Sequence, residues 1–196
     1  RMVVISPCDS IEAKKATEAC AKTDSPTYIR LAREKTPVIT TADSPFEIGK
    51  AQVLWQPAAG KPQVGIIATG ALVHRALKVA RDLEKEKIGV TVLNLATIKP
   101  LDERAIIRLA QETVGVGSLS EIGGLGRIVT VEEHQIAGGM GSAVAELLAK
   151  QCPSAIEFVG VSDEFGQSGT PDELIEHYGM GESHIMAAVK KVLKRK

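Results

Sequence analysis

The last two-thirds of the chain alternates between two spacings of hydrophobic residues. Four apolar runs have the length of buried strands, at 64–69, 90–95, 127–132 and 155–161. Between them, apolar residues recur at helical spacing, most clearly from Leu72 to Leu83. Strands that alternate with helices predict right-handed crossovers and a mostly parallel sheet that is covered on both faces.

Helix-start signals support this reading. Asp102 introduces a helix that carries Ile106 and Leu109, and Thr170-Pro171-Asp172-Glu173 has the sequence of a helix cap with proline at the first helical position. Further helices are predicted over about 141–150, 171–178 and 182–194. The second part of the chain therefore reads as an α/β domain.

The first 35 residues are organised differently. Residues 2–6 and 27–33 suit strands, and a helix capped by Asp9 is expected between them to about Ala21, with Glu12 at capping-box spacing. A unit of two strands and one helix cannot cover its own faces. We therefore expect an earlier part of this domain to precede Arg1, the alternative being that Met2 is a natural start.

Residues 36–62 read as a linker and a domain boundary. Prolines and glycines punctuate the segment, which has no helical period and contains one extended stretch, from Phe46 to Trp55. The regular strand and helix pattern begins after it, so 63–196 is the predicted second domain.

Composition narrows the class of protein. Of 196 residues, 44% are hydrophobic but only 3% aromatic, which argues against binding of single-stranded nucleic acid on stacking platforms. The net charge is zero, so no global field attracts the chain to nucleic acid or to an acidic membrane. Three widely spaced cysteines predict reduced thiols and no metal site. With no apolar stretch of membrane-spanning length, we expect a cytoplasmic protein.

Candidate chemistry lies where strands end, because ligands of parallel sheets meet the carboxyl ends of the strands. Glu132, Glu133 and His134 follow one strand and could serve as acid and base. Consecutive residues point in different directions, however, which favours helix-start and interface roles. Gly138, Gly139 and Gly141 then open a helix that could bind phosphate or allow a tight turn. Close packing against another chain is favoured, because the known nucleotide fingerprints are absent.

Arg30 and Arg33 are candidates for phosphate binding, because guanidinium groups bind phosphate through two parallel hydrogen bonds. If the strand continues through Arg33, the odd spacing places the two side chains on opposite faces. Only one of them then faces a site.

A set of motifs, in this order and spacing, resembles the transketolase family of thiamine diphosphate enzymes. The motifs cover nearly the whole chain and are Ser6-Pro7-Cys8-Asp9, Tyr28-Ile29-Arg30-Leu31-Ala32-Arg33, Thr97-Ile98-Lys99-Pro100-Leu101-Asp102, Thr130-Val131-Glu132-Glu133-His134 with Gly138-Gly139-Met140-Gly141, and Phe165-Gly166-Gln167-Ser168-Gly169-Thr170-Pro171. Each motif is weak alone, whereas the ordered set is specific.

The resemblance implies a fold and a domain plan. Residues 63–196 would be a C-terminal domain with a three-layer α/β/α architecture and a five-stranded, mostly parallel sheet. The one antiparallel strand would be the extended stretch from Phe46 to Trp55, within the 36–62 linker. Residues 1–35 would be a βαβ remnant, the tail of the pyrimidine-binding domain.

The resemblance also implies an activity for the parent enzyme. Family members transfer a two-carbon ketol unit between sugar phosphates with thiamine diphosphate and Mg²⁺, and they assemble as dimers. The family's cofactor-binding and activating motifs precede this region, so the chain itself is expected to be inactive. It would contribute assembly, in a homodimer or with an N-terminal thiamine-binding subunit, and one contact to the substrate phosphate through Arg33.

Alternatives remain open at the level of sequence. The stretch from Val114 to Gly126 is longer than the family's usual connection, which affects the expected geometry near Glu132. A non-catalytic dimerisation module of a related enzyme, a deoxyxylulose-phosphate synthase or a 2-oxoacid dehydrogenase β subunit, is the second hypothesis. A stand-alone nucleotide-binding protein is third, disfavoured by the absent glycine fingerprint.

Overall fold

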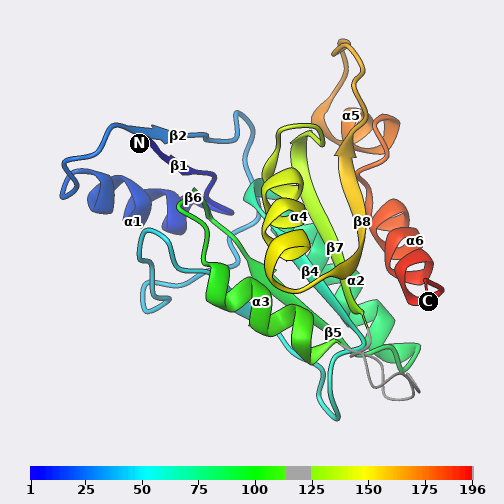
Figure 1. Cartoon of the computed structure of the whole chain (residues 1–196). Helices are drawn as coiled ribbons and strands as arrows, with labels where there is room; N and C mark the ends of the chain where they lie inside the picture. The colour runs from blue at the N-terminus through cyan, green and yellow to red at the C-terminus, as the bar shows by residue number, and fades with distance from the viewer. Residues whose placement is uncertain (114–124, 196) are drawn as a thin grey trace.

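A computed structural model describes residues 1–113 and 125–195 and shows a five-stranded sheet between two layers of helices, with a smaller unit beside it (Figure 1). The strand order is β3 (Gln52–Trp55), β5 (Val90–Asn94), β4 (Val64–Ala68), β7 (Gly126–Gln135) and β8 (Ser154–Val161). Neighbouring strands are parallel except β3, which is antiparallel to β5. The predicted fold class is confirmed, and so is the single antiparallel strand, although β3 begins at Gln52 and not at Phe46 as expected.

Alternate residues along the central strands enter two separate cores. Ile66 and Val92 face the core that contains α2 (Val73–Lys85) and α6 (Glu182–Leu193). Ile67 and Leu93 face the core that contains α3 (Glu103–Glu112) and α4 (Met140–Gln151). Because successive side chains of a strand point to opposite faces, apolar runs with no polar alternation require helices on both sides.

Two short helices complete the domain. The 3₁₀ helix η1 (Gly70–Leu72) leads into α2, and Gly70 has φ 62°, a conformation that favours glycine. Helix α5 (Pro171–His177) begins as predicted, with the carboxylate of Glu173 accepting hydrogen bonds from the N–H and the hydroxyl of Thr170 at 3.0 and 2.7 Å. Most of the long connection expected from Val114 to Gly126 lies outside the described residues.

The N-terminal unit contains α1 (Ser10–Cys20) and a three-stranded sheet of order β2 (Thr27–Ile29), β1 (Val3–Ile5) and β6 (Thr97–Lys99). The expected strand through Arg33 is wrong: β2 ends at Ile29, where its pairing with β1 ends. Strand β6 was not predicted. It comes from the larger domain and pairs antiparallel with β1, so its partner lies more than 90 residues away in sequence.

A buried polar cluster joins the two units. The carboxylate of Glu12 accepts hydrogen bonds from the Cys8 N–H at 2.7 Å and from Asn94 Nδ2, at the end of β5, at 2.7 Å. Asp9 accepts from the Glu12 N–H at 2.8 Å and so caps α1, as predicted. The buried face of α1 therefore includes the carboxylate of Glu12 beside Ala16.

None of the helices within the described part of the chain has the length and apolar character needed to cross a membrane.

Candidate functional site

Of the two adjacent acids near the end of β7, Glu132 and Glu133, Glu132 has its side chain buried inside the protein. Its side chain lies in β7 with the residue only 2% exposed, and its carboxylate oxygens accept hydrogen bonds from the Met140 and Gly141 N–H groups at 2.6 and 2.7 Å. These donors belong to the first turn of α4, where N–H groups have no partner inside the helix. Glu132 therefore caps α4 from a neighbouring strand.

The next two residues point elsewhere. Glu133 is exposed to a groove and lies 3.9 Å from Arg30 Nη2, whereas His134 is exposed with its Nδ1 2.9 Å from the Gln135 carbonyl oxygen. The three candidate acid and base groups thus diverge. Alternation along a strand separates Glu133 from its two neighbours, and the pairing of β7 with β8 is irregular between Val131 and Gln135, where His134 lies. No shared acid and base site forms among these three residues.

Burial raises the pKa of Glu132, and the two N–H donors of α4 oppose that rise. The helix N-terminus favours negative charge at this point as well. The position that could bind a phosphate at α4 is therefore taken by the protein's own carboxylate. Phosphate binding at the Gly138 turn was one of the alternatives from the sequence. The N–H groups of Met140 and Gly141 are not free for it, because both already donate to Glu132.

The glycines of the turn allow this close approach within the chain. Gly138 has φ 76°, which suits a tight turn. A Cβ atom on Gly139 would overlap the Gln135 carbonyl oxygen and the Glu132 carboxylate, and one on Gly141 would lie 2.6 Å from Thr130 Oγ1. The observed close packing is against strand β7 of the same chain, whereas the sequence favoured packing against another chain.

Replacing Gly139 by alanine is expected to lower the free energy of unfolding by about 1–3 kcal/mol, because the added methyl must displace the Glu132 cap or the backbone. Gly166→Ala is the matched control, since nothing lies within 4 Å of a Cβ there. Urea denaturation of both variants measures the difference. Equal stabilities would mean that the turn does not constrain Glu132.

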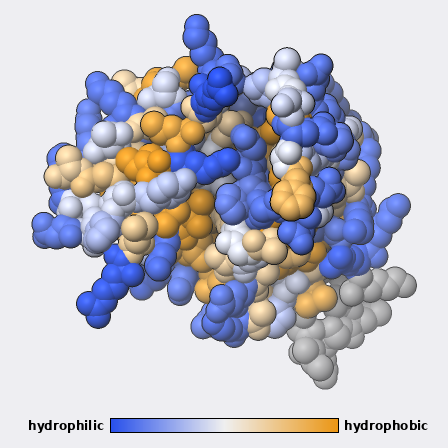
Figure 2. Space-filling model, turned by 90° about the horizontal axis from the view of Figure 1, so that it is seen from above, coloured by the Kyte–Doolittle hydropathy of each residue, from blue (hydrophilic) through white to orange (hydrophobic). Residues whose placement is uncertain are grey.

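A groove of about 1110 Å³ lies between the segment after β2, the start of α2 and the α5 region. Its apolar part includes Leu72, Ile175 and Met180, and its rim includes Arg30 and Arg33. Figure 2 looks down on this face of the molecule and shows hydrophobic residues bordered by hydrophilic ones. The groove is large enough to hold a small molecule or a peptide segment.

Most charges on the α2 and α5 side of the groove are paired with each other. Arg75, 19% exposed, lies 2.5 Å from Asp172, 3.7 Å from Glu182 and 3.9 Å from Glu176. Lys78 pairs with Glu182 as well. Burial, followed by the charge of Lys78, lowers the pKa of His74, so this side chain favours its neutral form. This wall therefore ties α5 and α6 to α2.

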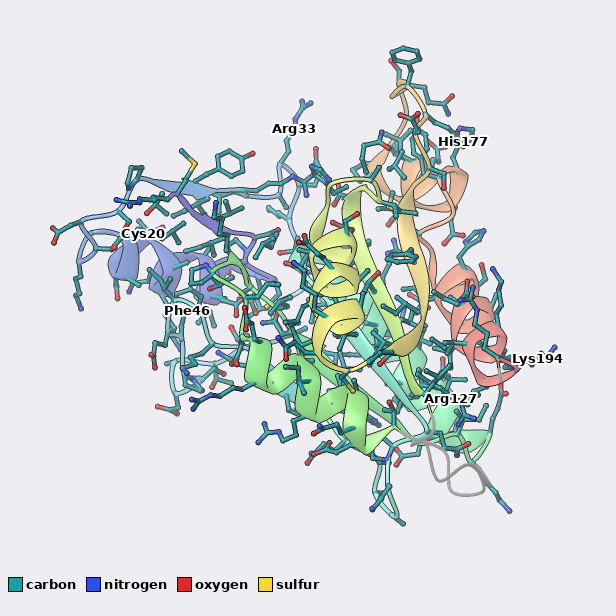
Figure 3. All side chains as sticks on the ribbon, in the orientation of Figure 1. Cys20, Arg33, Phe46, Arg127, His177 and Lys194 are labelled. Atoms are coloured by element: carbon teal, nitrogen blue, oxygen red, sulfur yellow. The ribbon has the colours of Figure 1, made fainter. Side chains whose placement is uncertain are left out.

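Arg33 is open to solvent at the opposite rim of the groove. Its side chain is 96% exposed, and its Nε lies 4.0 Å from the carboxylate of Glu34. Figure 3 shows it projecting away from the core, beyond the end of β2. Arg30, by contrast, faces Glu133. As predicted, the two arginines have different environments. The reason differs from the predicted one, because both follow the end of β2 and lie in irregular backbone, not on opposite faces of a strand.

The ordered motifs and this fold agree with a comparison against protein families. The family model described as transketolase, C-terminal domain, matches residues 49–185. The chain belongs to the transketolase family. It is 37% identical to the 6-deoxy-6-sulfo-D-fructose transketolase subunit of Clostridium sp. (strain MSTE9), covering all of this chain and 56% of that relative. It is 34% identical to the transketolase of Rattus norvegicus, over 98% of this chain and 29% of that enzyme.

Solved structures of transketolases share the fold. A split gene transketolase, described as an inactive β4 tetramer, superposes with a TM-score of 0.86 at 36% identity, over 98% of this chain and 58% of that one. The transketolase of Campylobacter jejuni shows the same fold, with a TM-score of 0.69 at 20% identity, over 97% of this chain and 26% of that one. The chain thus spans little more than half of its shorter relatives.

The residues present do not fit the family's cofactor. Across residues 1–113 and 125–195, no group of three or more His, Cys, Asp or Glu side chains could hold a metal ion such as Mg²⁺. The N–H groups of Met140 and Gly141 at the N-terminus of α4 are capped by Glu132.

Sequence reasoning missed two features of the site. The Glu12 and Asn94 contact and the Arg75 ion-pair cluster each join residues at least 80 positions apart. The sequence held one local signal for the first contact, the position of Glu12. A glutamate at the third position of a helix usually accepts a hydrogen bond from the N–H of the N-cap residue, here Asp9. It contacts the Cys8 N–H, one residue before that cap.

Proposed function

We propose that this chain is the C-terminal portion of a transketolase that transfers a two-carbon ketol unit between sugar phosphates, as in the pentose phosphate pathway. Family membership and the ordered motifs support the proposal. The observation that carries it is Arg33, an open guanidinium at the rim of a groove, at the position that matches the family's phosphate-binding arginine.

In this proposal the parent enzyme uses thiamine diphosphate and Mg²⁺, held mainly by segments outside this chain. Residues 1–35 are the tail of the pyrimidine-binding domain, 36–62 the linker with the antiparallel strand, and 63–196 the C-terminal domain. The chain alone is inactive and acts in assembly, in a homodimer or with an N-terminal thiamine-binding subunit. The related inactive β4 tetramer supports both statements. A cytoplasmic location remains a prediction.

Arg33→Ala in the full-length enzyme is expected to raise KM for phosphorylated acceptors by about 10- to 100-fold, because a charge-assisted contact to phosphate is lost. The KM for unphosphorylated acceptors should change little. Steady-state ketol transfer with thiamine diphosphate and Mg²⁺ present measures both values. Lys22→Ala, an exposed cation outside the groove, is the matched control.

Two outcomes would overturn different parts of the proposal. Equal effects of Arg33→Ala on both acceptor classes would remove the phosphate role of Arg33. A full-length parent with no ketol transfer would favour the second candidate, a non-catalytic dimerisation module of a related thiamine diphosphate enzyme. That candidate is favoured by the divergence of Glu132, Glu133 and His134.

A further inference from the structure

The segment 162–170, which we call the arm, projects from the molecule between β8 and α5 (Figure 1). Every residue of the arm is exposed, and Phe165 is 100% exposed. The other two phenylalanines are at least partly covered, because Phe46 packs against the core of the N-terminal unit and Phe158 is 37% exposed. Aromatic residues are enriched at protein interfaces, so Phe165 is a candidate contact residue.

Hydrogen bonds from other elements hold the arm in shape. The Gln135 side chain, at the end of β7, accepts from the Asp163 N–H at 2.9 Å and donates to the Glu164 carbonyl oxygen at 3.2 Å. The Tyr178 hydroxyl donates to the Phe165 carbonyl oxygen at 2.8 Å. The backbone that presents Phe165 is therefore ordered before any partner binds, which lowers the entropic cost of binding.

The arm and Arg33 belong to one face of the molecule. Arg33 lies on the rim of the groove, and Gly169 and Thr170 at the base of the arm line the same groove. Tyr178, which holds the backbone of Phe165, lines it as well. Figure 3, in the orientation of Figure 1, shows Arg33 projecting on the same side of the molecule as the arm. A protein segment that approaches Arg33 from outside therefore also approaches Phe165.

The groove does not attract the arm, whether from its own chain or from a second copy. The arm carries the acids Asp163 and Glu164 beside Phe165. The groove includes acids of its own, such as Glu133 and Asp172, among its cations. Complementary charge is therefore missing between arm and groove. Phe165 needs a different apolar surface, and the groove stays free for a substrate.

The proposed function places the thiamine-binding segments of the parent enzyme against this face. The substrate phosphate contacts Arg33, and the reacting carbons of the same sugar lie at the thiamine diphosphate. A sugar phosphate is a short molecule, so the segments that hold the cofactor must approach Arg33 to within its length. Related chains have additional sequence, since this chain spans 56% of the Clostridium relative and 58% of the split transketolase chain.

We propose that the arm is a docking element for the thiamine-binding segments of the parent enzyme, with Phe165 in an apolar pocket of those segments. The groove beside the arm stays open for the substrate phosphate at Arg33. The inference rests on the proposed function and assigns one contact surface of its assembly. The arm contributes binding and adds no catalytic group.

Photocross-linking identifies the segment that covers Phe165. The full-length enzyme with benzoylphenylalanine in place of Phe165 is irradiated and digested, and we expect mass spectrometry to find cross-linked peptides from the thiamine-binding segments. The matched control has the same probe in place of Ala59, an exposed residue before β4, at the opposite edge of the parallel sheet, and should give no such peptide. Cross-links from position 165 only to another copy of residues 1–196, or to nothing, would overturn the proposal.

Thiol labelling tests the same contact without a bulky probe. In the full-length enzyme, N-ethylmaleimide is expected to modify Phe165→Cys at least about 10-fold more slowly than Ala59→Cys, because a position in an interface reacts only when the contact opens. Mass spectrometry of the two peptides measures the rates separately from those of the other cysteines.

The outcomes distinguish this surface from the proposed function. An enzyme that is active in ketol transfer but labels Phe165→Cys as fast as Ala59→Cys would overturn the docking role of the arm and leave the proposed function intact. A full-length enzyme without ketol transfer would overturn the proposed function and the inference that rests on it.

Discussion

Glu132→Ala is expected to lower the free energy of unfolding by about 2–5 kcal/mol, because two buried N–H donors of α4 lose the carboxylate that accepts from them, at roughly 1–3 kcal/mol each. The carboxylate also fills the space left by Gly139 and Gly141. Urea denaturation followed by far-ultraviolet circular dichroism measures the change. The effect falls on stability because Glu132 is buried and contacts the backbone of its own chain.

Two variants distinguish the capping of α4 by Glu132 from the effect of removing a negative charge. Glu132→Gln keeps one acceptor and the shape of the side chain, so its loss should be smaller than that of Glu132→Ala. Glu133→Ala changes the adjacent acid, whose exposed ion pair with Arg30 contributes at most about 1 kcal/mol. Losses of the same size for Glu132→Ala and Glu133→Ala would show that Glu132 does not cap α4.

Glu12→Ala is expected to lower the free energy of unfolding by about 2–4 kcal/mol, because the buried Cys8 N–H would lose its carboxylate acceptor and Asn94 Nδ2 would keep only the weak acceptor Cys8 Sγ at 3.7 Å. The loss should loosen the contact between the N-terminal unit and the end of β5. Hydrogen exchange at α1 and β1 should therefore increase more than exchange at β4 and β7. Glu18→Ala, exposed on α1, is the control and should change neither measurement.

The charge of Glu12 gives a separate, pH-dependent expectation. Burial raises the pKa of Glu12, against the hydrogen bonds from Cys8 and Asn94 that lower it. Below its ordinary pKa of 4.5, Glu12 is protonated in both the folded and the unfolded chain. The contribution of neutral Glu12 to the free energy of unfolding is fully present below pH 4.5. It is lost as the pH rises through the raised pKa of Glu12 in the folded state.

Glu12→Gln should therefore become more stable relative to the natural chain as pH rises above about 4.5, and the difference should level off above the raised pKa. Glutamine also suits the site, because Asn94 Oδ1 has no hydrogen-bond partner among the described residues and could accept from its amide after a flip of Asn94. Unfolding free energies of both proteins from pH 4 to 9 test this. Parallel profiles would contradict it.

Much of the fold follows from local pattern. The apolar runs around Ile66 and Val92 have no polar alternation, which indicates strands covered on both faces, and both lie in the central sheet. Asp9 and Asp102 cap helices where the sequence places caps, because a capping side chain bonds to N–H groups within three residues. These features depend on neighbours in sequence and can be read without the fold.

The candidate site could be predicted from the sequence only in part. Glu132, Glu133 and His134 form one short motif, yet the first caps a helix, the second faces a groove and the third is exposed. Sequence adjacency gives no direction in space until the strand is placed in a sheet. Strand β6 was missed for a related reason, because a three-residue segment forms a strand only when β1 lies beside it.

The sequence by itself determined the elements, their caps and, through an ordered set of motifs, the family. Those properties rest on hydrophobic periodicity and on hydrogen bonds between near neighbours. Only the tertiary structure decided that Glu12 meets Asn94, that Arg75 joins α2 to α5, and that Gly169 and Thr170 lie on the same groove as Arg33. Each of these contacts links positions far apart along the chain, and packing of the whole sheet and its helices brings them together.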